Sequence, residues 1–218
     1  MTQTGIFSGR VQIPYAYGCY GYTRGGGATW HGGIDLVGLD NTTIRMPWYT
    51  APDGSRKAIT GKVITARIVT DHSNRTWEWG YYVCVRLDAA QTPDAVNYLY
   101  FCHCAKLLVE AGQTVRSGDA LAVMGNSGNA ALNDPPYAHC HLEVRATATG
   151  RGLDPTAYSG TPNAAGCYGT AADPAPAEES RMQVITIGPV SQGDADAILA
   201  VCAARGLTDA GLYTSRWV

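Results

Sequence analysis

The chain has 218 residues, enough for one large domain, or one domain with a small appendage, to bury a core without disulfides. Its 26 glycines and 11 prolines favour a turn-rich, sheet-based fold over a helical bundle. The formal charge is -2 and the 16 Lys and Arg residues are dispersed, which argues against nucleic acid as the main partner.

The N-terminus has no cationic segment followed by an apolar one, and no later run reaches the ~18 apolar residues that a membrane span needs. We therefore expect synthesis in the cytoplasm without a signal peptide, and no membrane span. The seven cysteines are odd in number and form no CxxC pair, which favours reduced thiols over a disulfide framework.

The first motif in chain order is His31-Gly-Gly-Ile-Asp35. Two consecutive glycines before Ile-Asp-Leu-Val predict a tight turn that runs into a strand. Asp35 then offers a hard oxygen ligand beside an imidazole nitrogen, a mixture that suits Zn²⁺.

Segments rich in β-branched and aromatic residues recur after residue 60, separated by turn signals, which is typical of an antiparallel all-β domain. The predicted strands are Lys62–Thr70, Tyr81–Leu87, Asn97–Cys104, Ala120–Met124 and Ala138–Arg145. We assign residues 1–160 to this domain.

Two histidines alternate with a cysteine in the last of these strands, His139-Cys140-His141. Alternation puts both imidazoles on one side of the strand, roughly 6–7 Å apart. An isolated pair of this kind can also be a partly exposed strand feature. Two histidines and one carboxylate would leave a fourth tetrahedral position open for water, as in a catalytic zinc site.

Cysteines flank the histidines of two predicted strands: Cys102 and Cys104 on either side of His103, and Cys140 between the other pair. Alternation predicts that all three thiols lie on the face opposite the zinc and pack in the core.

The composition shifts to Gly, Ala, Pro, Asn and Thr after the β domain, which predicts a linker over residues 161–180. Residues 181–218 read as a strand–helix–strand unit, with a strand over Met182–Ile187. A capping box at Ser191-Gln-Gly-Asp194 opens the helix, and Gly206 is placed to end it.

Six landmarks together carry a family resemblance, and they span about residues 11 to 158. They are His31-Gly-Gly-Ile-Asp35-Leu, Tyr100-Phe-Cys-His103, Gly112-Gln-Thr-Val-Arg-Ser-Gly118-Asp, Gly125-Asn-Ser-Gly128, Ala138-His139-Cys-His141-Leu-Glu143 and Leu153-Asp-Pro. In order and rough spacing the chain resembles the lysostaphin-type (LytM-like) zinc endopeptidases of peptidoglycan. The resemblance implies a small antiparallel β domain with a groove, one Zn²⁺ per chain, and hydrolysis of peptide bonds in stem peptides or cross-bridges of the bacterial cell wall.

The resemblance assigns the zinc ligands to His31, Asp35 and His141, and leaves His103 and His139 as catalytic imidazoles beside the metal. One of these two should act as the general base and the other should hydrogen-bond the developing oxyanion, and the sequence does not decide between them. Family members also carry a tyrosine that stabilises the tetrahedral intermediate. Tyr20 and Tyr22 are the candidates here, and packing in the groove wall is the alternative for both.

Two further features have two interpretations each, and two segments have one. Glu143 either orients a ligand imidazole or forms an ion pair with Arg145. The turn around Asn126 and Ser127 either contacts substrate backbone or only reverses the chain. Residues 65–82 and 88–97 read as extended loops beside the groove that set specificity.

The predicted function is therefore a zinc-dependent peptidoglycan endopeptidase, of the kind a phage or prophage endolysin provides after release by a holin or by lysis. Two alternatives are a non-catalytic wall-binding member of the family and a structural module of a phage tail. The unit 181–218 resembles half of a sporulation-related (SPOR-like) peptidoglycan-binding repeat. It is expected to pair with a second chain as a homodimer, or else to pack as an appendage without a binding role.

Overall fold

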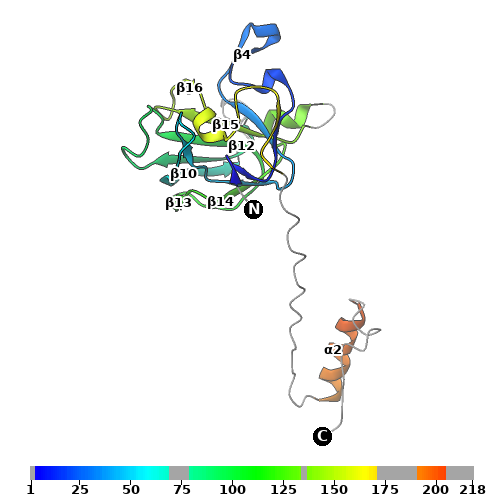
Figure 1. The fold of residues 1–218 in the computed structure, drawn as a ribbon. Helices are drawn as coiled ribbons and strands as arrows, with labels where there is room; N and C mark the ends of the chain where they lie inside the picture. Colours follow the sequence, from blue (N-terminus) through cyan, green and yellow to red (C-terminus); the bar gives the residue numbers. More distant parts are fainter. Residues whose placement is uncertain (1–2, 69–78, 134–136, 171–190, 205–218) are drawn as a thin grey trace. The chain divides into compact units, whose positions relative to one another are not determined.

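The computed structural model describes residues 3–68, 79–133, 137–170 and 191–204 (Figure 1). Contacts divide the chain into unit 1, Met1–Ala175, and unit 2, Pro176–Val218. The strands of unit 1 pair antiparallel throughout its described residues and outnumber its short helical turns, so the predicted mainly β fold is confirmed.

One large antiparallel sheet organises unit 1, with the path β13-β10-β11-β12-β15-β6-β3-β17; β14 joins β12 to β7, and β16 pairs with β15. Its strands are β3 (Val11–Ile13), β6 (Ile34–Gly38), β7 (Thr43–Arg45), β10 (Thr60–Ile68), β11 (Tyr81–Leu87), β12 (Tyr98–Leu107), β13 (Thr114–Arg116), β14 (Ala120–Met124), β15 (Cys140–Arg145), β16 (Gly152–Leu153) and β17 (Gly166–Tyr168).

Short hairpins and helical turns complete unit 1. The paired strands are β1 (Gln3–Thr4) with β2 (Phe7–Ser8), β4 (Gly21–Arg24) with β5 (Thr29–His31), and β8 (Tyr49–Thr50) with β9 (Arg56–Lys57). The helical turns are η1 (Ala16–Gly18), η2 (Gly25–Gly27), η4 (Gly128–Leu132) and α1 (Thr156–Ser159). The β4–β5 hairpin projects from the sheet (Figure 1).

The two faces of the sheet differ in chemistry where β12 pairs with β15. On one face Phe101 lies opposite Leu142, and both are buried in the main core. On the other face Cys102 lies opposite His141. Directly opposed residues of antiparallel strands share a face, so this second face carries the histidine pair of β15.

His103 breaks the alternation of β12. A regular strand would point its side chain into the core on the same face as Phe101. Its φ is 62°, in the left-handed region that non-glycine residues seldom adopt, and the pairing register shifts just beyond it, between Cys104 and Lys106. The irregularity turns the His103 ring towards His139, with 4.7 Å between ring centroids.

This irregularity also corrects one prediction about the cysteines. Cys104 and Cys140 do pack in the main core, as expected. Cys102 does not, because it precedes the irregularity and stays on the face of His141, buried in a smaller cluster with Tyr82, Cys84 and Tyr100. Simple alternation through residue 103 was the wrong assumption.

The two segments predicted as specificity loops have different outcomes. Within the first, residues 65–68 belong to β10 and residues 69–78, including His72, lie outside the described residues. The second, residues 88–97, borders a separate hollow with Arg86 and Ala146 and is absent from the lining of the main cavity described below. Its Asp94 accepts a hydrogen bond from the buried Tyr158 hydroxyl at 2.9 Å, so this segment packs against α1.

Part of the predicted linker is folded. β17 pairs with β3 as an edge strand, with Cys167 opposite Gln12, so the sheet extends beyond residue 160. Tyr168 packs against the core, which gives this short segment an apolar anchor. The remainder of the predicted linker, residues 171–180, lies outside the described residues.

Unit 2 is described only over its helix α2, Gln192–Ala204. One of the two hydrogen bonds of the predicted capping box is present: the backbone N–H of Asp194 donates to the Ser191 hydroxyl at 3.2 Å, while the Asp194 carboxylate accepts from that hydroxyl at 2.6 Å. The predicted strand Met182–Ile187, Gly206 and the second strand lie outside the described residues, so self-pairing of this unit stays a prediction. No helix in the described ranges has the length and apolar character that a membrane span needs.

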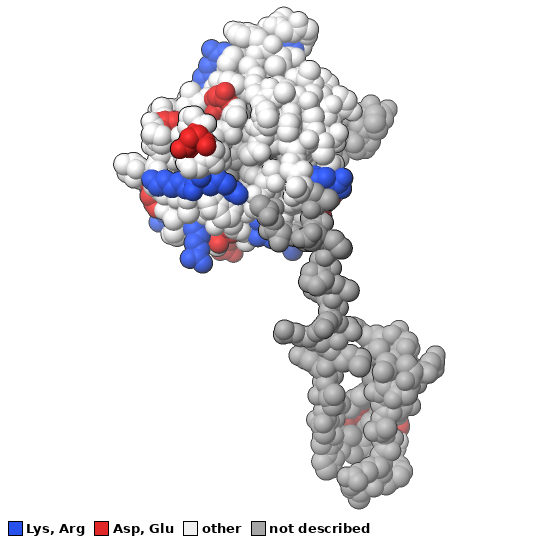
Figure 2. Space-filling view, in the orientation of Figure 1, with Lys and Arg blue, Asp and Glu red and all other residues white. Residues whose placement is uncertain are grey.

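The surface of unit 1 agrees with the charge pattern of the sequence. On the face seen in Figure 2, basic and acidic side chains are interspersed among neutral ones.

Candidate metal centre

Three side chains that are distant in the sequence converge over the sheet. His31 ends β5, Asp35 lies in β6, and His141 lies in β15, where it is the register partner of Asp35. One donor atom from each lies within 4.8 Å of the other two, and all three residues are buried. The predicted turn at His31-Gly-Gly is confirmed, since it joins β5 to β6.

Gly33 allows this convergence. A Cβ atom at this position would lie 2.3 Å from the carbonyl oxygen of Leu142 and 2.8 Å from Cε1 of His141. Any other residue would therefore push β15 away from β6.

Hydrogen bonds orient the two histidines that are candidate metal ligands. Nδ1 of His31 is 2.8 Å from the carbonyl oxygen of Cys19, which can only accept, so Nδ1 carries the proton and Nε2 keeps its lone pair. Nε2 of His141 lies 3.3 Å from a Glu143 carboxylate oxygen and donates to it, so Nδ1 is the nitrogen that faces Asp35 and would bind a metal once it loses its proton.

The remaining ring nitrogens of the two histidines face one another and a carboxylate. Nε2 of His31 lies 3.0 Å from Nδ1 of His141, which is 3.0 Å from Oδ1 of Asp35. Burial would lower the pKa of His141, but Asp35 and Glu143 raise it to about 9. The surroundings therefore favour a positive charge here, and the donor set of two imidazoles and one carboxylate fits Zn²⁺.

Two further imidazoles lie beside this group. The Nδ1 proton of His103 is donated to the Ser127 carbonyl at 2.9 Å, and that of His139 to the Tyr137 carbonyl at 3.1 Å. Burial, reinforced by His139 and His141, lowers the pKa of His103 to about 3. Burial also lowers the pKa of His139. Both rings are therefore neutral near pH 7, and each keeps an unprotonated Nε2.

All five residues border one open cavity of about 910 Å³. Its walls include Tyr15, Tyr17 and Tyr137, and Trp79. A groove of this size accommodates an extended peptide, with the histidines and Asp35 at its floor.

The profile of peptidase family M23 matches residues 56–169, more than half of the chain. The chain belongs to peptidase family M23. The match includes His103, His139 and His141. It begins after His31 and Asp35, and it is the geometry of the structure that brings His31 and Asp35 into the site.

Several solved structures resemble this M23 chain at low identity. The catalytic domain of lysostaphin from Staphylococcus simulans is 19% identical, with 66% of this chain and 90% of that chain covered and a TM-score of 0.44. The prophage-encoded M23 protein EnpA from Enterococcus faecalis, represented by its catalytic domain, is also 19% identical, with 63% and 85% covered and a TM-score of 0.44. A structure of the SpoIIIAH and SpoIIQ complex is 16% identical, with 71% and 96% covered and a TM-score of 0.45.

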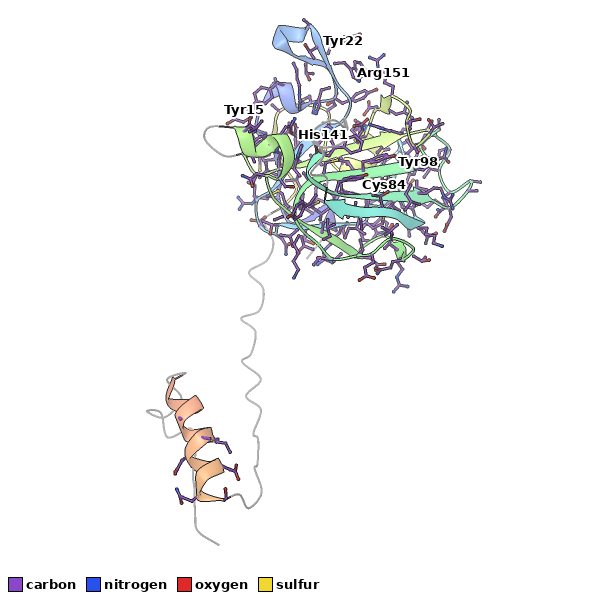
Figure 3. All side chains as sticks on the ribbon, turned by 180° about the vertical axis from the view of Figure 1, so that it is seen from behind. Tyr15, Tyr22, Cys84, Tyr98, His141 and Arg151 are labelled. Atoms are coloured by element: carbon purple, nitrogen blue, oxygen red, sulfur yellow. The ribbon has the colours of Figure 1, made fainter. Side chains whose placement is uncertain are left out.

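The two tyrosines predicted to assist catalysis lie outside the cavity lining of this M23 chain. The Tyr20 hydroxyl donates to the Gly152 carbonyl at 3.2 Å, and both Tyr20 and Tyr22 pack edge-on against Trp30. Tyr22 is 62% exposed on the projecting hairpin, on the same side of the domain as Arg151 (Figure 3). The packing alternative fits these contacts better than contact with a reacting group.

Glu143 combines both of its predicted roles. One carboxylate oxygen accepts from His141, and the other accepts from Nε of Arg145 at 2.7 Å. Arg145 is in turn held over the rings of Trp79 and Tyr100, at 5.0 and 4.8 Å from their centroids. The ligand imidazole is therefore oriented by a chain of fixed contacts.

Two residues that shape the site were not predicted from the sequence, and a third was predicted without its observed role. Tyr137 stacks on the His139 ring at 4.3 Å, and Arg24 donates to Asp35 at 2.9 Å. Ser127, for which the sequence left open a contact to substrate or a plain turn, positions His103 through its carbonyl, and its hydroxyl donates to the Cys104 carbonyl at 2.7 Å. The closeness of Tyr137 to His139 was the one available signal, because orienting carbonyls leave no trace in residue type.

Proposed function

We propose that this chain is a zinc-dependent endopeptidase that hydrolyses peptide bonds in the stem peptides or cross-bridges of bacterial peptidoglycan, and that it acts on the cell wall. One observation carries the proposal: Nε2 of His31, Oδ1 of Asp35 and Nδ1 of His141 converge at one place, with two neutral imidazoles beside them. Membership of a peptidase family supports it.

His31, Asp35 and His141 would hold the metal. A bound Zn²⁺ lowers the pKa of water and polarises a carbonyl group. Cys19 and Glu143 keep the two ligand imidazoles in the tautomers that binding requires.

His103 and His139 would move the proton. Each resting ring can accept a proton at Nε2, because its Nδ1 proton is committed to a backbone carbonyl. Once protonated, that ring can donate the same proton to the leaving amine or hydrogen-bond the developing oxyanion. The carbonyls of Ser127 and Tyr137 hold both rings in position throughout.

The test is release of new amino groups from purified peptidoglycan by the zinc-loaded full chain, compared with chelator-treated protein and with protein reloaded with zinc. We expect hydrolysis that the chelator abolishes and zinc restores. Binding to the sacculi without release of amino groups would contradict the proposal and favour a non-catalytic wall-binding module.

A further inference from the structure

Arg24 brings a guanidinium group into the cavity. It ends β4, on the projecting hairpin, and its side chain is 41% exposed. Within the described ranges it is the only Lys or Arg among the residues that line the cavity. A cation at this place influences which peptides the groove accepts.

The contacts of Arg24 leave part of its guanidinium free. Nη2 lies 2.9 Å from Oδ2 of Asp35 and 2.9 Å from Nε2 of His31, and Nε donates to the Tyr17 carbonyl at 3.4 Å. Among the described residues no hydrogen bond engages Nη1, so its two N–H groups remain available to a ligand.

A metal would change these contacts in one direction. The Nε2 lone pair of His31 is then committed to the metal, so Arg24 loses that acceptor. Oδ2 of Asp35 stays within reach, because Oδ1 is the oxygen that faces His141. The guanidinium would keep its anchor on Asp35 and gain donors for the groove.

The charges around the cavity favour an anionic ligand. Its two carboxylates are already engaged: Asp35 contacts His31, His141 and Arg24, and Glu143 is paired with Arg145. With a divalent cation bound, the group formed by that cation, these two carboxylates and the two arginines is net positive. Arginine binds carboxylates through paired, charge-assisted hydrogen bonds.

We propose that Arg24 is a specificity residue that binds a carboxylate of the peptide substrate beside the metal site. This inference rests on the proposed function. It deepens that function by naming the substrate class: peptides that carry a free carboxylate close to the scissile bond, as opposed to their amidated forms.

The experiment uses a synthetic stem peptide that the full chain cleaves, together with a set in which each carboxylate is replaced in turn by a carboxamide. For wild type we expect one replacement to lower kcat/KM by about 10- to 100-fold, the range for a hydrogen bond to a charged group. In Arg24→Gln the acid and amide peptides should be cleaved at similar rates, and Arg24→Lys should recover part of the preference.

Binding gives a second readout that does not need turnover. Calorimetry of the acid and amide peptides with zinc-loaded His103→Ala, and with His103→Ala combined with Arg24→Gln, should show the same preference and its loss. Arg151→Gln is the matched control. It also removes an arginine near the hairpin, but Arg151 lies over Trp30, 3.6 Å from the ring centroid, and is not among the residues that line the cavity.

The outcomes separate the two proposals. If wild type cleaves no stem peptide and releases nothing from peptidoglycan, the proposed function fails. Suppose that wild type cleaves the peptides and that Arg24→Gln leaves every ratio of kcat/KM between acid and amide peptide unchanged. The proposed function then stands and the Arg24 inference is wrong. If Arg24→Gln bound less zinc and its ratios of kcat/KM between acid and amide peptides were unchanged, Arg24 would only help to position Asp35. That result would also overturn the inference.

Discussion

The proposed metal ligands and the proposed proton-transfer histidines of this site are positioned by different backbone geometry. Asp35 and His141 are register partners on neighbouring regular strands, so ordinary pleat geometry directs both side chains to one place. His103 reaches the same cavity only because the backbone of β12 departs from the strand conformation, with a φ of 62°. Regular pairing thus places two of the three proposed metal ligands, and a local irregularity places one of the two catalytic candidates.

The largest effect should follow from removing one of the proposed metal ligands. His141→Ala removes one of three donors and leaves Asp35 without its paired imidazole, so we expect loss of bound zinc and of all hydrolysis. Metal analysis of the purified protein should fall from near one equivalent to near zero. Retention of one equivalent of zinc would contradict the ligand assignment.

A smaller effect should follow from changes in the two proposed proton-transfer histidines. His103→Ala and His139→Ala should each keep zinc and lose about 10²- to 10⁴-fold in rate, the usual contribution of a general base or oxyanion donor. Zinc stoichiometry and peptidoglycan hydrolysis, measured on the same preparations, check this. If either variant lost its zinc, the assignment of His103 and His139 to proton transfer and not to metal binding would be wrong.

Glu143→Gln tests a residue that supports His141, one of the proposed metal ligands. The amide can still accept a hydrogen bond from His141, but it lacks the charge that pairs with Arg145 and makes the imidazole a better ligand. We expect zinc affinity to fall by about 10- to 100-fold, measured by competition with a chromophoric chelator. The matched control is Glu110→Gln, an exposed carboxylate, which should leave zinc affinity unchanged.

The smallest expected effect is on the pH dependence of stability. Because the folded-state pKa of His103 is about 3 and the ordinary value is 6.5, the unfolded chain takes up this proton first as the pH falls. This residue therefore lowers the free energy of unfolding as pH falls from about 6.5 towards 3, by at most about 1.4 kcal/mol per pH unit. Urea unfolding at several pH values should show a shallower decline for His103→Gln. Identical slopes for the two proteins would argue that His103 is not held neutral.

Sequence reasoning succeeded where the chain follows simple periodicity. The strand periodicity located β11 and β14 at their observed bounds, and the spacing of His139 and His141 placed both imidazoles on one face. The two glycines after His31 predicted the turn that returns the chain as β6. These features depend on neighbours in sequence, which a single sequence displays directly.

The same reasoning failed where contacts are long-range or the backbone is irregular. Cys102 was assigned to the wrong face because nothing in residue type announces a left-handed backbone at His103. Arg24 was overlooked because its relation to Asp35 depends on how the projecting hairpin folds back. Tyr20 and Tyr22 were candidates from the family resemblance; they lie outside the cavity lining, which Tyr15 and Tyr17 belong to, and their part in catalysis stays a prediction.

The pairing of β6 with β15 has a consequence for how the protein is made. Asp35 and His141 are separated by 106 positions, so two of the three donors cannot meet until most of unit 1 has left the ribosome. Contacts between distant segments form late because closing a long loop costs entropy. Zinc capture should therefore be one of the last events of folding. The rate of zinc uptake by the refolding chain would report completion of the sheet, and a nascent chain that has not yet reached His141 should have no such site to fill.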